Sequence, residues 1–392
     1  MNGSDRLSSI GSYAFADVDN LVASLKEKGI DTIDFGVGDP QDPTPEVVRN
    51  ACKDALDTRK SSGYPSYDGS GKYRATISEW IKWRFGIELD MDTEITSTVG
   101  AKEAVFHMPL AFVNDGDYVI SPNPYYPAYE RGTLFANGRC HFLNLVKEQG
   151  FMLDLDSIPG DVLKKTKMLW VNYPSNPTGA LADDDFFREL ADFAVDNDIL
   201  VISDECYSEM YFDERPRSIL EFGYENILAI NSLSKRSNMT NYRVGWVMGD
   251  SNAIKLFRKV KTNIDSGTPT FIQDAAVAAL GDETHVEAMR QGYRVKRDII
   301  CDAFRDIGYP ESAPQSTFYI WQQAPEGVSG VDVAKLLLDE SIGLVTTPGA
   351  WLSKEIDGVN PGERFIRLAL VPSIEDCKVA AEKIRGAECL NP

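Results

Sequence analysis

Five short runs of apolar residues dominate the middle of this chain, and longer amphipathic stretches separate them. Each run is nearly continuous in apolar residues and rich in valine and isoleucine, as is typical of strands buried on both faces of a mostly parallel sheet. Residues 183–197, between two of the runs, carry apolar side chains at helical spacing, and this alternation predicts an α/β fold with helices flanking a central sheet. The runs are Tyr118–Ser121, Met168–Val171, Ile199–Ser203, Ile227–Ile230 and Val244–Met248.

The end of the chain has a different pattern, in which strands and helices no longer alternate regularly. We therefore expect a large α/β domain over residues 46–285 and a smaller α+β domain built from residues 1–45 and 286–392. The elements expected in the last part are a long helix over 286–307, strands over 317–323 and 364–370, and a closing helix over 373–385.

Composition and charge exclude several classes of protein. Apolar residues make up 43% of the 392 residues, which is enough for a buried core, and the formal charge of −20 would repel nucleic acids and anionic membranes. No run approaches the roughly 18 apolar residues of a membrane helix, and the N-terminus lacks a signal-peptide pattern, so we expect a cytoplasmic protein. The six cysteines form no CxxC pair and the three histidines have no metal-ligand spacing, so we expect no disulfide scaffold and no metal site.

Polar side chains follow four of the five apolar runs. Because ligands bind beyond the carboxyl ends of the strands in open α/β sheets, we expect these residues to meet at one edge. Each segment alone has an ordinary explanation as a turn, a helix cap or a solvated charge, but their joint placement predicts a functional site. The segments are 122–127, 172–179, 204–207 and 231–236.

The side chains in these segments suit a phosphorylated cofactor that carries an aldehyde and a pyridine ring. A lysine amine condenses with an aldehyde to form a Schiff base. An aspartate can pair with the pyridinium nitrogen and keep the ring an electron sink. Hydroxyl groups, an arginine and a helix N-terminus can hold a phosphate dianion.

From about Tyr13 to Arg367, the chain resembles the class I/II aminotransferases, fold-type I enzymes of the aspartate aminotransferase superfamily that use pyridoxal 5'-phosphate. The most specific stretch is residues 232–245, SLSKRSNMTNYRVG, which is similar to the family's lysine signature, with an arginine eight positions after the lysine. Asn176-Pro-Thr-Gly and Asp204-Glu-Cys-Tyr precede it in the family's order. Asn241 is a departure, because many relatives have glycine there.

The resemblance implies a role for each matching residue around the cofactor ring. Lys235 would bind the cofactor aldehyde and then move a proton between substrate and cofactor. Asp204 would pair with the pyridinium nitrogen, and Tyr207 and Asn176 would hydrogen-bond the ring oxygen. Tyr126, from the family pattern Tyr-Pro-x-Tyr, would stack on the ring, with the adjacent Tyr125 as the alternative.

The same resemblance implies a phosphate site and a shared interface. Tyr64, in the segment GYPSYDG, resembles a tyrosine that reaches the phosphate of the neighbouring subunit, which implies a homodimer with shared active sites, although this segment could also be only a loop. The residues expected to bind the phosphate within one chain are Arg243, Ser232, Ser234, and Gly100, Ala101 and Lys102 at a helix start, with Ser232 a better match than Ser234.

Arg367 is the expected clamp for the substrate α-carboxylate. A guanidinium binds a carboxylate in bidentate fashion, and an arginine within an apolar strand is costly to leave unpaired. Gly38 would let the N-terminal segment approach the same carboxylate through its backbone, or would merely permit a turn. Residues 12–19 and 261–267 are similar to LL-diaminopimelate aminotransferases, where residues at the Tyr13 and Lys102 positions contact substrate.

The resemblance implies an amino-acid biosynthetic enzyme that moves an amino group from an amino acid to a 2-oxo acid. The best match is LL-diaminopimelate or a related amino acid with 2-oxoglutarate. Aspartate, alanine and aromatic aminotransferases share most of the pattern, and the same chemistry could also serve a C–S β-lyase. A cofactor-binding regulator would need an added DNA-binding segment, for which this acidic chain leaves no room.

Overall fold

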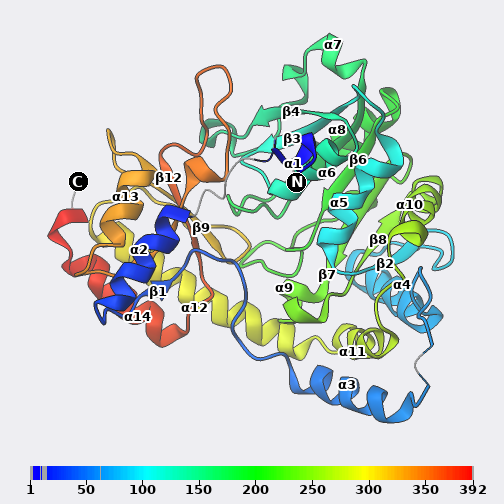
Figure 1. The fold of residues 1–392 in the computed structure, drawn as a ribbon, viewed down its shortest axis with the longest axis horizontal. Helices are drawn as coiled ribbons and strands as arrows, with labels where there is room; N and C mark the ends of the chain where they lie inside the picture. The colour runs from blue at the N-terminus through cyan, green and yellow to red at the C-terminus, as the bar shows by residue number, and fades with distance from the viewer. Residues whose placement is uncertain (1–2, 9, 11–15, 62, 391–392) are drawn as a thin grey trace.

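A seven-stranded sheet forms the centre of the protein in the computed structural model, which describes residues 3–8, 10, 16–61 and 63–390 (Figure 1). The strand order is β2-β8-β7-β6-β5-β3-β4, and all neighbours are parallel except β8, which is antiparallel to β2 and β7. The predicted α/β fold is therefore confirmed. The strands are β2 (Ile95–Thr98), β3 (Tyr118–Asn123), β4 (Arg139–Asn144), β5 (Thr166–Val171), β6 (Leu200–Asp204), β7 (Ile227–Ser232) and β8 (Gly245–Gly249).

All five apolar runs lie in strands, since β3, β5, β6, β7 and β8 contain most of each run. Two strands of the seven-stranded sheet, β2 and β4, are absent from the sequence prediction. The sequence of β2 is Ile-Thr-Ser-Thr, which is polar although all four residues are buried. The sheet edge strand β4 is only partly buried and begins with the exposed Arg139. Neither segment has the continuous apolar pattern on which the prediction depended.

Helices cover both faces of this sheet, and strand side chains alternate between two apolar clusters. One cluster packs strand residues against α4, α8 and α11, and the other packs them against α5, α6 and α10. Helix α8 begins where the Asp183 carboxylate accepts a hydrogen bond from the amide of Phe186, 2.8 Å away. The helices in this part of the chain are α3 (Glu46–Thr58), α4 (Gly71–Phe85), α5 (Ala101–Phe112), α6 (Pro127–Phe135), the short α7 (Gly160–Leu163), α8 (Asp184–Asp196), α10 (Ser251–Ile264) and α11 (Thr270–Leu280).

Segments from both ends of the chain pack together beside the large sheet. In the N-terminal segment, β1 (Ile33–Asp34) pairs in parallel with β10 (Leu344–Val345), and a three-stranded antiparallel sheet has the order β11-β12-β9. The division at residues 45 and 285 stays a prediction. The remaining elements are α1 (Asp5–Ser8), α2 (Ala16–Glu27), α12 (Thr284–Asp306), β9 (Tyr319–Gln323), α13 (Gly330–Leu337), β11 (Thr347–Pro348), β12 (Phe365–Ala369) and α14 (Ile374–Gly386).

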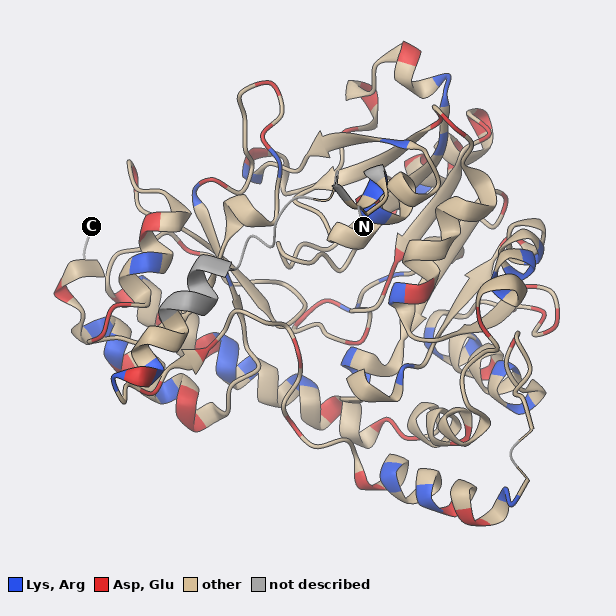
Figure 2. Ribbon diagram, in the orientation of Figure 1, with Lys and Arg blue, Asp and Glu red and all other residues tan. Residues whose placement is uncertain are grey.

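Charged residues lie mainly on the helices and loops. Figure 2 shows Lys, Arg, Asp and Glu distributed along the outer helices, whereas the strands of the large sheet carry few of them. This distribution fits strands that are covered on both faces. Within the described ranges, the structure has no helix that is both long and apolar enough to cross a membrane.

The close crossing of α5 and α6 provides a test of this packing. A Cβ atom added at Gly132 in α6 would lie 2.8 Å from the Phe106 carbonyl oxygen and 3.1 Å from its Cα, both backbone atoms. We expect Gly132→Ala to lower the free energy of unfolding by about 1–3 kcal/mol, because the two helix backbones would have to separate. Urea denaturation monitored by circular dichroism measures this change.

The control is Gly71→Ala in the first turn of α4, where an added Cβ would meet no atom within 4 Å. This substitution should leave the stability unchanged or raise it by up to about 1 kcal/mol, since alanine restricts the unfolded chain. Equal stability of the two variants would contradict the packing of α5 on α6.

Candidate active site

A cavity of about 620 Å³ lies where the carboxyl ends of β5, β6 and β7 meet residues from both ends of the chain. Its position beyond the strand ends is the one expected for a ligand site in an open α/β sheet. Most of the residues predicted for the cofactor and substrate line it. These are Gly38, Ala101, Lys102, Tyr126, Asn176, Asp204, Tyr207, Ser232, Ser234, Lys235, Arg243 and Arg367.

Three predicted residues stand apart from this lining. Gly100 caps α5 with a φ of 72°, and a side chain at this position would overlap the guanidinium of Arg243. Tyr64 is 92% exposed and does not border the cavity. Tyr13 lies outside the described residues. Tyr125 is hydrogen-bonded to Glu130 through its hydroxyl group, whereas Tyr126 faces the cavity.

Lys235 lies on α9 (Leu233–Arg236), a single turn that directly follows β7. Its Nζ atom donates a hydrogen bond to the Gly38 carbonyl oxygen, 2.6 Å away, and lies 5.5 Å from the centre of the Phe318 ring. A Cβ atom at Gly38 would overlap the Tyr319 hydroxyl, so only glycine allows the N-terminal segment to come this close. The chain thus holds a primary amine at the cavity wall without an acidic partner among the described residues.

Asp204 ends β6 and is 7% exposed. Its carboxylate accepts hydrogen bonds from the Tyr129 hydroxyl at 2.9 Å and from the Cys206 amide at 3.2 Å. Burial raises the pKa of Asp204, and these hydrogen bonds oppose that shift only in part. In the described part of the chain, no lysine, arginine or histidine pairs with this carboxylate.

Two tyrosines border the same space. The hydroxyls of Tyr207 and Tyr319 lie 3.3 Å apart, and burial together with this neighbour raises the pKa of Tyr207 well above its usual value. Burial and the nearby Asp204 carboxylate raise the pKa of Tyr126 to about 12. Both phenols are therefore protonated at neutral pH and can donate a hydrogen bond to an acceptor on a ligand.

Arg367 lies on β12 and is only 9% exposed. Its guanidinium donates to the Gly36 carbonyl oxygen at 2.9 Å and to the Asn176 side-chain oxygen at 3.3 Å, and it lies over the Tyr319 ring at 4.6 Å. Its Nε atom is buried without a hydrogen-bond partner, and no carboxylate from the described residues pairs with it. A buried cation in this state is suited to an anion that comes from outside.

Arg243 marks the other end of the cavity, near the start of α5. It has a φ of 52°, and its guanidinium donates to the Thr240 carbonyl at 2.6 Å and, more weakly, to the Val99 carbonyl at 3.5 Å. The Ser232 hydroxyl, 2.9 Å from that of Ser234, donates to the Val244 carbonyl. An arginine, hydroxyl groups and the free amides of a helix start are together the donors that a phosphate needs.

The donor set therefore fits the predicted cofactor. Asp204, Arg243 and Arg367 are charged groups without an oppositely charged partner in the described chain. Their charges match, in order, a pyridinium nitrogen, a phosphate and a substrate carboxylate. Lys235 lines the same cavity and supplies the amine.

Three residues without a predicted role also contribute. Asn172 accepts from the Asn176 amide at 2.8 Å and donates to the Asp204 carbonyl at 2.7 Å, so it joins two of the strand ends. Tyr129 holds the Asp204 carboxylate, and Tyr319 lies against Arg367 and Tyr207. Asn172 lies in the segment 172–179, which is predicted to reach this edge of the sheet, whereas nothing in the sequence indicates the contacts of Tyr319.

The raised pKa of Asp204 leads to a test on the ligand-free protein. A carboxyl group has a pKa of about 3.9 in an unfolded chain. The pKa of Asp204 is higher in the folded protein than in the unfolded chain. Ionised Asp204 therefore begins to destabilise the fold as pH rises through the pKa of the unfolded chain, and the destabilisation is complete above the pKa of the folded protein. Asp204→Asn should therefore stabilise the ligand-free protein at pH 7 by on the order of 1 kcal/mol, and this gain should vanish near pH 4.

Denaturant unfolding between pH 4 and pH 8 measures this gain, with Asp156→Asn as the control at an exposed aspartate. The Tyr129 hydroxyl can rotate to accept from the new amide, so the variant keeps a partner. A loss of stability in Asp204→Asn at neutral pH would contradict the account of an unpaired buried charge.

Comparisons with known proteins identify the family of the chain. A family model described as aminotransferase class I and II matches residues 30–384. An LL-diaminopimelate aminotransferase from Aquifex aeolicus is 41% identical over 98% of both chains, and one from Halothermothrix orenii is 38% identical over 99% of both. A solved aminotransferase structure from Neisseria meningitidis superimposes with a TM-score of 0.90 at 32% identity, covering 97% of this chain and 98% of that one. The chain thus belongs to the class I and II aminotransferases, enzymes that use pyridoxal 5'-phosphate to transfer amino groups.

Proposed function

We propose that this aminotransferase takes its amino group from LL-diaminopimelate or a closely related amino acid and passes it to a 2-oxo acid, with 2-oxoglutarate the best candidate. Relatives named for LL-diaminopimelate match this chain over nearly its full length at about 40% identity, for example 41% and 40%. The buried Arg367 without a carboxylate partner, in the same cavity as Lys235, is the observation that carries amino transfer, and the choice of donor rests on these relatives.

Arg367 would bind the α-carboxylate of either substrate. The guanidinium is already oriented by Gly36 and Asn176, so little side-chain entropy is lost when a carboxylate arrives. Its position over the Tyr319 ring also limits its rotation. Binding the carboxylate at this fixed point would set the direction of the substrate Cα–H bond relative to Lys235.

The cofactor would be held at both ends by residues of one chain. Asp204 would bind the pyridinium nitrogen, Tyr207 and Asn176 the ring oxygen, and Tyr126 one face of the ring. The residues for the phosphate would be Arg243, Ser232, Ser234 and the helix start at Gly100, Ala101 and Lys102. When bound, pyridoxal phosphate supplies an electron sink that stabilises negative charge at the substrate Cα.

Lys235 would act as the base and acid for the substrate proton. Its amine reaches the cavity from the short helix α9, and the Gly38 carbonyl accepts one of its protons. A backbone carbonyl accepts a hydrogen bond but offers no proton. The neutral Lys235 amine therefore keeps its lone pair free to take a proton from the substrate. Lys235 would then remove the proton from Cα and deliver it to the cofactor within the same half-reaction, and with the 2-oxo acid it would carry a proton in the opposite direction.

We further propose that the enzyme is a homodimer in which Tyr64 completes the phosphate site of the partner. The support from this chain is the exposure of Tyr64, a residue that is 92% accessible to solvent. A tyrosine buries a large apolar ring when it enters an interface, so full exposure in the single chain is costly.

The predicted cytoplasmic location has support from the six cysteines, which are all free.

The first test measures amino transfer over a panel of donors with 2-oxoglutarate. We expect the highest kcat/KM with LL-diaminopimelate, and lower values with aspartate, alanine and phenylalanine. Lys235→Ala should lower kcat by at least about 10⁴-fold, because the proton transfer loses its base. Formation of pyruvate and ammonia from cysteine conjugates at a rate above any amino transfer would instead favour a β-lyase.

The second test asks whether Tyr64 acts across a dimer interface. Lys235→Ala and Tyr64→Ala chains that carry different tags are co-expressed, and the hybrid dimer is purified. If Tyr64 serves the partner's site, one of the two hybrid sites has both residues, so we expect about half of the wild-type activity. A hybrid no more active than the Tyr64→Ala homodimer, or an active monomer, would contradict the shared site.

A further inference from the structure

The helix that carries Lys235 is too short to fix its own orientation. It has four residues, and it is followed directly by a turn and a 3₁₀ segment at Thr240–Tyr242. One helical turn is held by few internal hydrogen bonds, so its direction depends on contacts with the rest of the protein. The strongest of these contacts come from Arg236, the residue next to Lys235.

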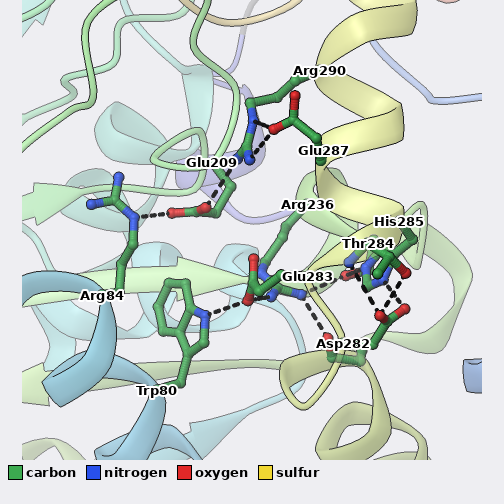
Figure 3. A network of polar contacts seen from close by, with 12 residues as sticks. Trp80, Arg84, Glu209, Arg236, Asp282, Glu283, Thr284, His285, Glu287 and Arg290 are labelled. Carbon is green, nitrogen blue, oxygen red and sulfur yellow. Dashed lines mark hydrogen bonds and ion pairs between the residues drawn. The ribbon is translucent and has the colours of Figure 1, made fainter.

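Arg236 points away from the cavity into a network of polar contacts, drawn in Figure 3. It is 1% exposed, donates to the Ala279 carbonyl oxygen at 2.8 Å, and forms an ion pair with Glu283. Its guanidinium lies over the ring of Trp80 at 5.4 Å, and the Trp80 indole donates to the same Glu283 carboxylate at 3.0 Å. Helix α11, helix α4 and the turn before α12 thus hold one side chain.

A second line of hydrogen bonds begins at Ser237, which ends the same short helix. The Ser237 hydroxyl lies 2.9 Å from Nε2 of His285 and accepts from Arg236 at 3.1 Å. Nδ1 of His285 lies 3.0 Å from Asp282, whose carboxylate also accepts from the Thr284 hydroxyl at 2.6 Å. The line Asp282–His285–Ser237–Arg236 therefore connects the start of α12 to α9. Figure 3 labels three of its members, Asp282, His285 and Arg236.

This line has the order of groups found in hydrolytic triads, but it does not make Ser237 a nucleophile. Ser237 is 1% exposed, and its oxygen accepts a hydrogen bond from a buried guanidinium. A substrate carbonyl could not approach such a hydroxyl. The arrangement is instead suited to holding a turn in one orientation.

The charges around His285 support the neutral form of its ring. Burial is the main cause that lowers the pKa of His285, Arg236 adds to the shift, and Asp282 and Glu283 oppose it. A neutral ring donates from Nδ1 to Asp282 and accepts at Nε2 from the Ser237 hydroxyl. The hydroxyl then keeps a lone pair for Arg236, so every hydrogen bond in the line joins one donor to one acceptor.

We propose that Arg236, Ser237 and His285 are positioning residues that fix the orientation of α9 and thereby the place of the Lys235 amine in the cavity. Consecutive helical residues project about 100° apart, so a side chain anchored at position 236 determines the direction of the one at position 235. The inference rests on the proposed role of Lys235 as the base. Nothing in the network touches the cavity itself, so its effect must act through α9.

The test compares Arg236→Gln, Ser237→Ala and His285→Gln with Arg290→Gln as the matched control. Arg290 lies on α12 in the same region, and its side chain is 15% exposed and pairs with Glu287 and Glu209 (Figure 3). It has no hydrogen bond or ion pair with a residue of α9. We expect Arg236→Gln and His285→Gln to lower kcat by roughly tenfold to a hundredfold with little change in the substrate KM, because a displacement of about 1 Å is enough for such a loss.

Two readouts do not depend on turnover. The visible absorption of the bound cofactor, titrated against pH, should change its midpoint in these variants, because the surroundings of the Lys235 amine change. Titration of the ligand-free variants with pyridoxal phosphate, followed by protein fluorescence, should show weaker binding. Arg290→Gln should lower the Tm to a similar extent and leave kcat, the absorption midpoint and cofactor affinity unchanged.

The inference is overturned if the Tm of these variants falls as much as that of Arg290→Gln while their kcat and absorption midpoint stay at the wild-type values. If Arg236→Gln does not fold, Ser237→Ala and His285→Gln decide the outcome. Lys235→Ala separates this inference from the proposed function. An inactive Lys235→Ala beside fully active Arg236 and His285 variants rejects only the positioning role, whereas an active Lys235→Ala rejects both.

Discussion

The candidate active site depends on charges that the protein buries without an opposite partner among the described residues. Arg367 at 9% exposure and Asp204 at 7% exposure face one cavity, and each is held by neutral groups. Burying a charge in this way costs free energy that a salt bridge within the chain would reduce. The fold keeps these charges apart, so that a ligand bearing the complementary charges lowers the cost when it binds. Such binding stabilises the folded state by linkage.

The same constraint explains why the chain has to bring its two ends together. The N-terminal segment supplies the Gly36 and Gly38 carbonyl oxygens, which accept from Arg367 and Lys235 respectively. The pairing of β1 with β10 holds this segment against the C-terminal part of the chain. Backbone carbonyls orient a cation without neutralising its charge, which a carboxylate would do. Neutral acceptors from a distant segment therefore position both cations while leaving them available to a ligand.

Much of this fold could be predicted from the sequence, because strands buried on both faces have a continuous apolar pattern. The polar strand β2 and the edge strand β4 escaped prediction since their burial depends on neighbours and not on their own composition. In the site, motifs located Lys235, Asp204 and Arg367 because each follows or lies in a recognisable strand. Asn172 follows a recognisable strand and Tyr319 lies in one, but their contacts escaped prediction, since they join segments 32 and 112 residues apart in the chain.

The network behind α9 shows a related limit of sequence reasoning. In the sequence, Arg236 is one more basic residue beside the lysine of the motif, and His285 is one of three scattered histidines. Only the structure brings α4, α11 and the start of α12 to the same guanidinium. A short turn between a strand and a loop has little stability of its own, so its orientation must be supplied by the surrounding helices. In the proposed arrangement, the position of Lys235 is fixed by residues that do not line the cavity, and their contribution depends on tertiary contacts that no local pattern encodes.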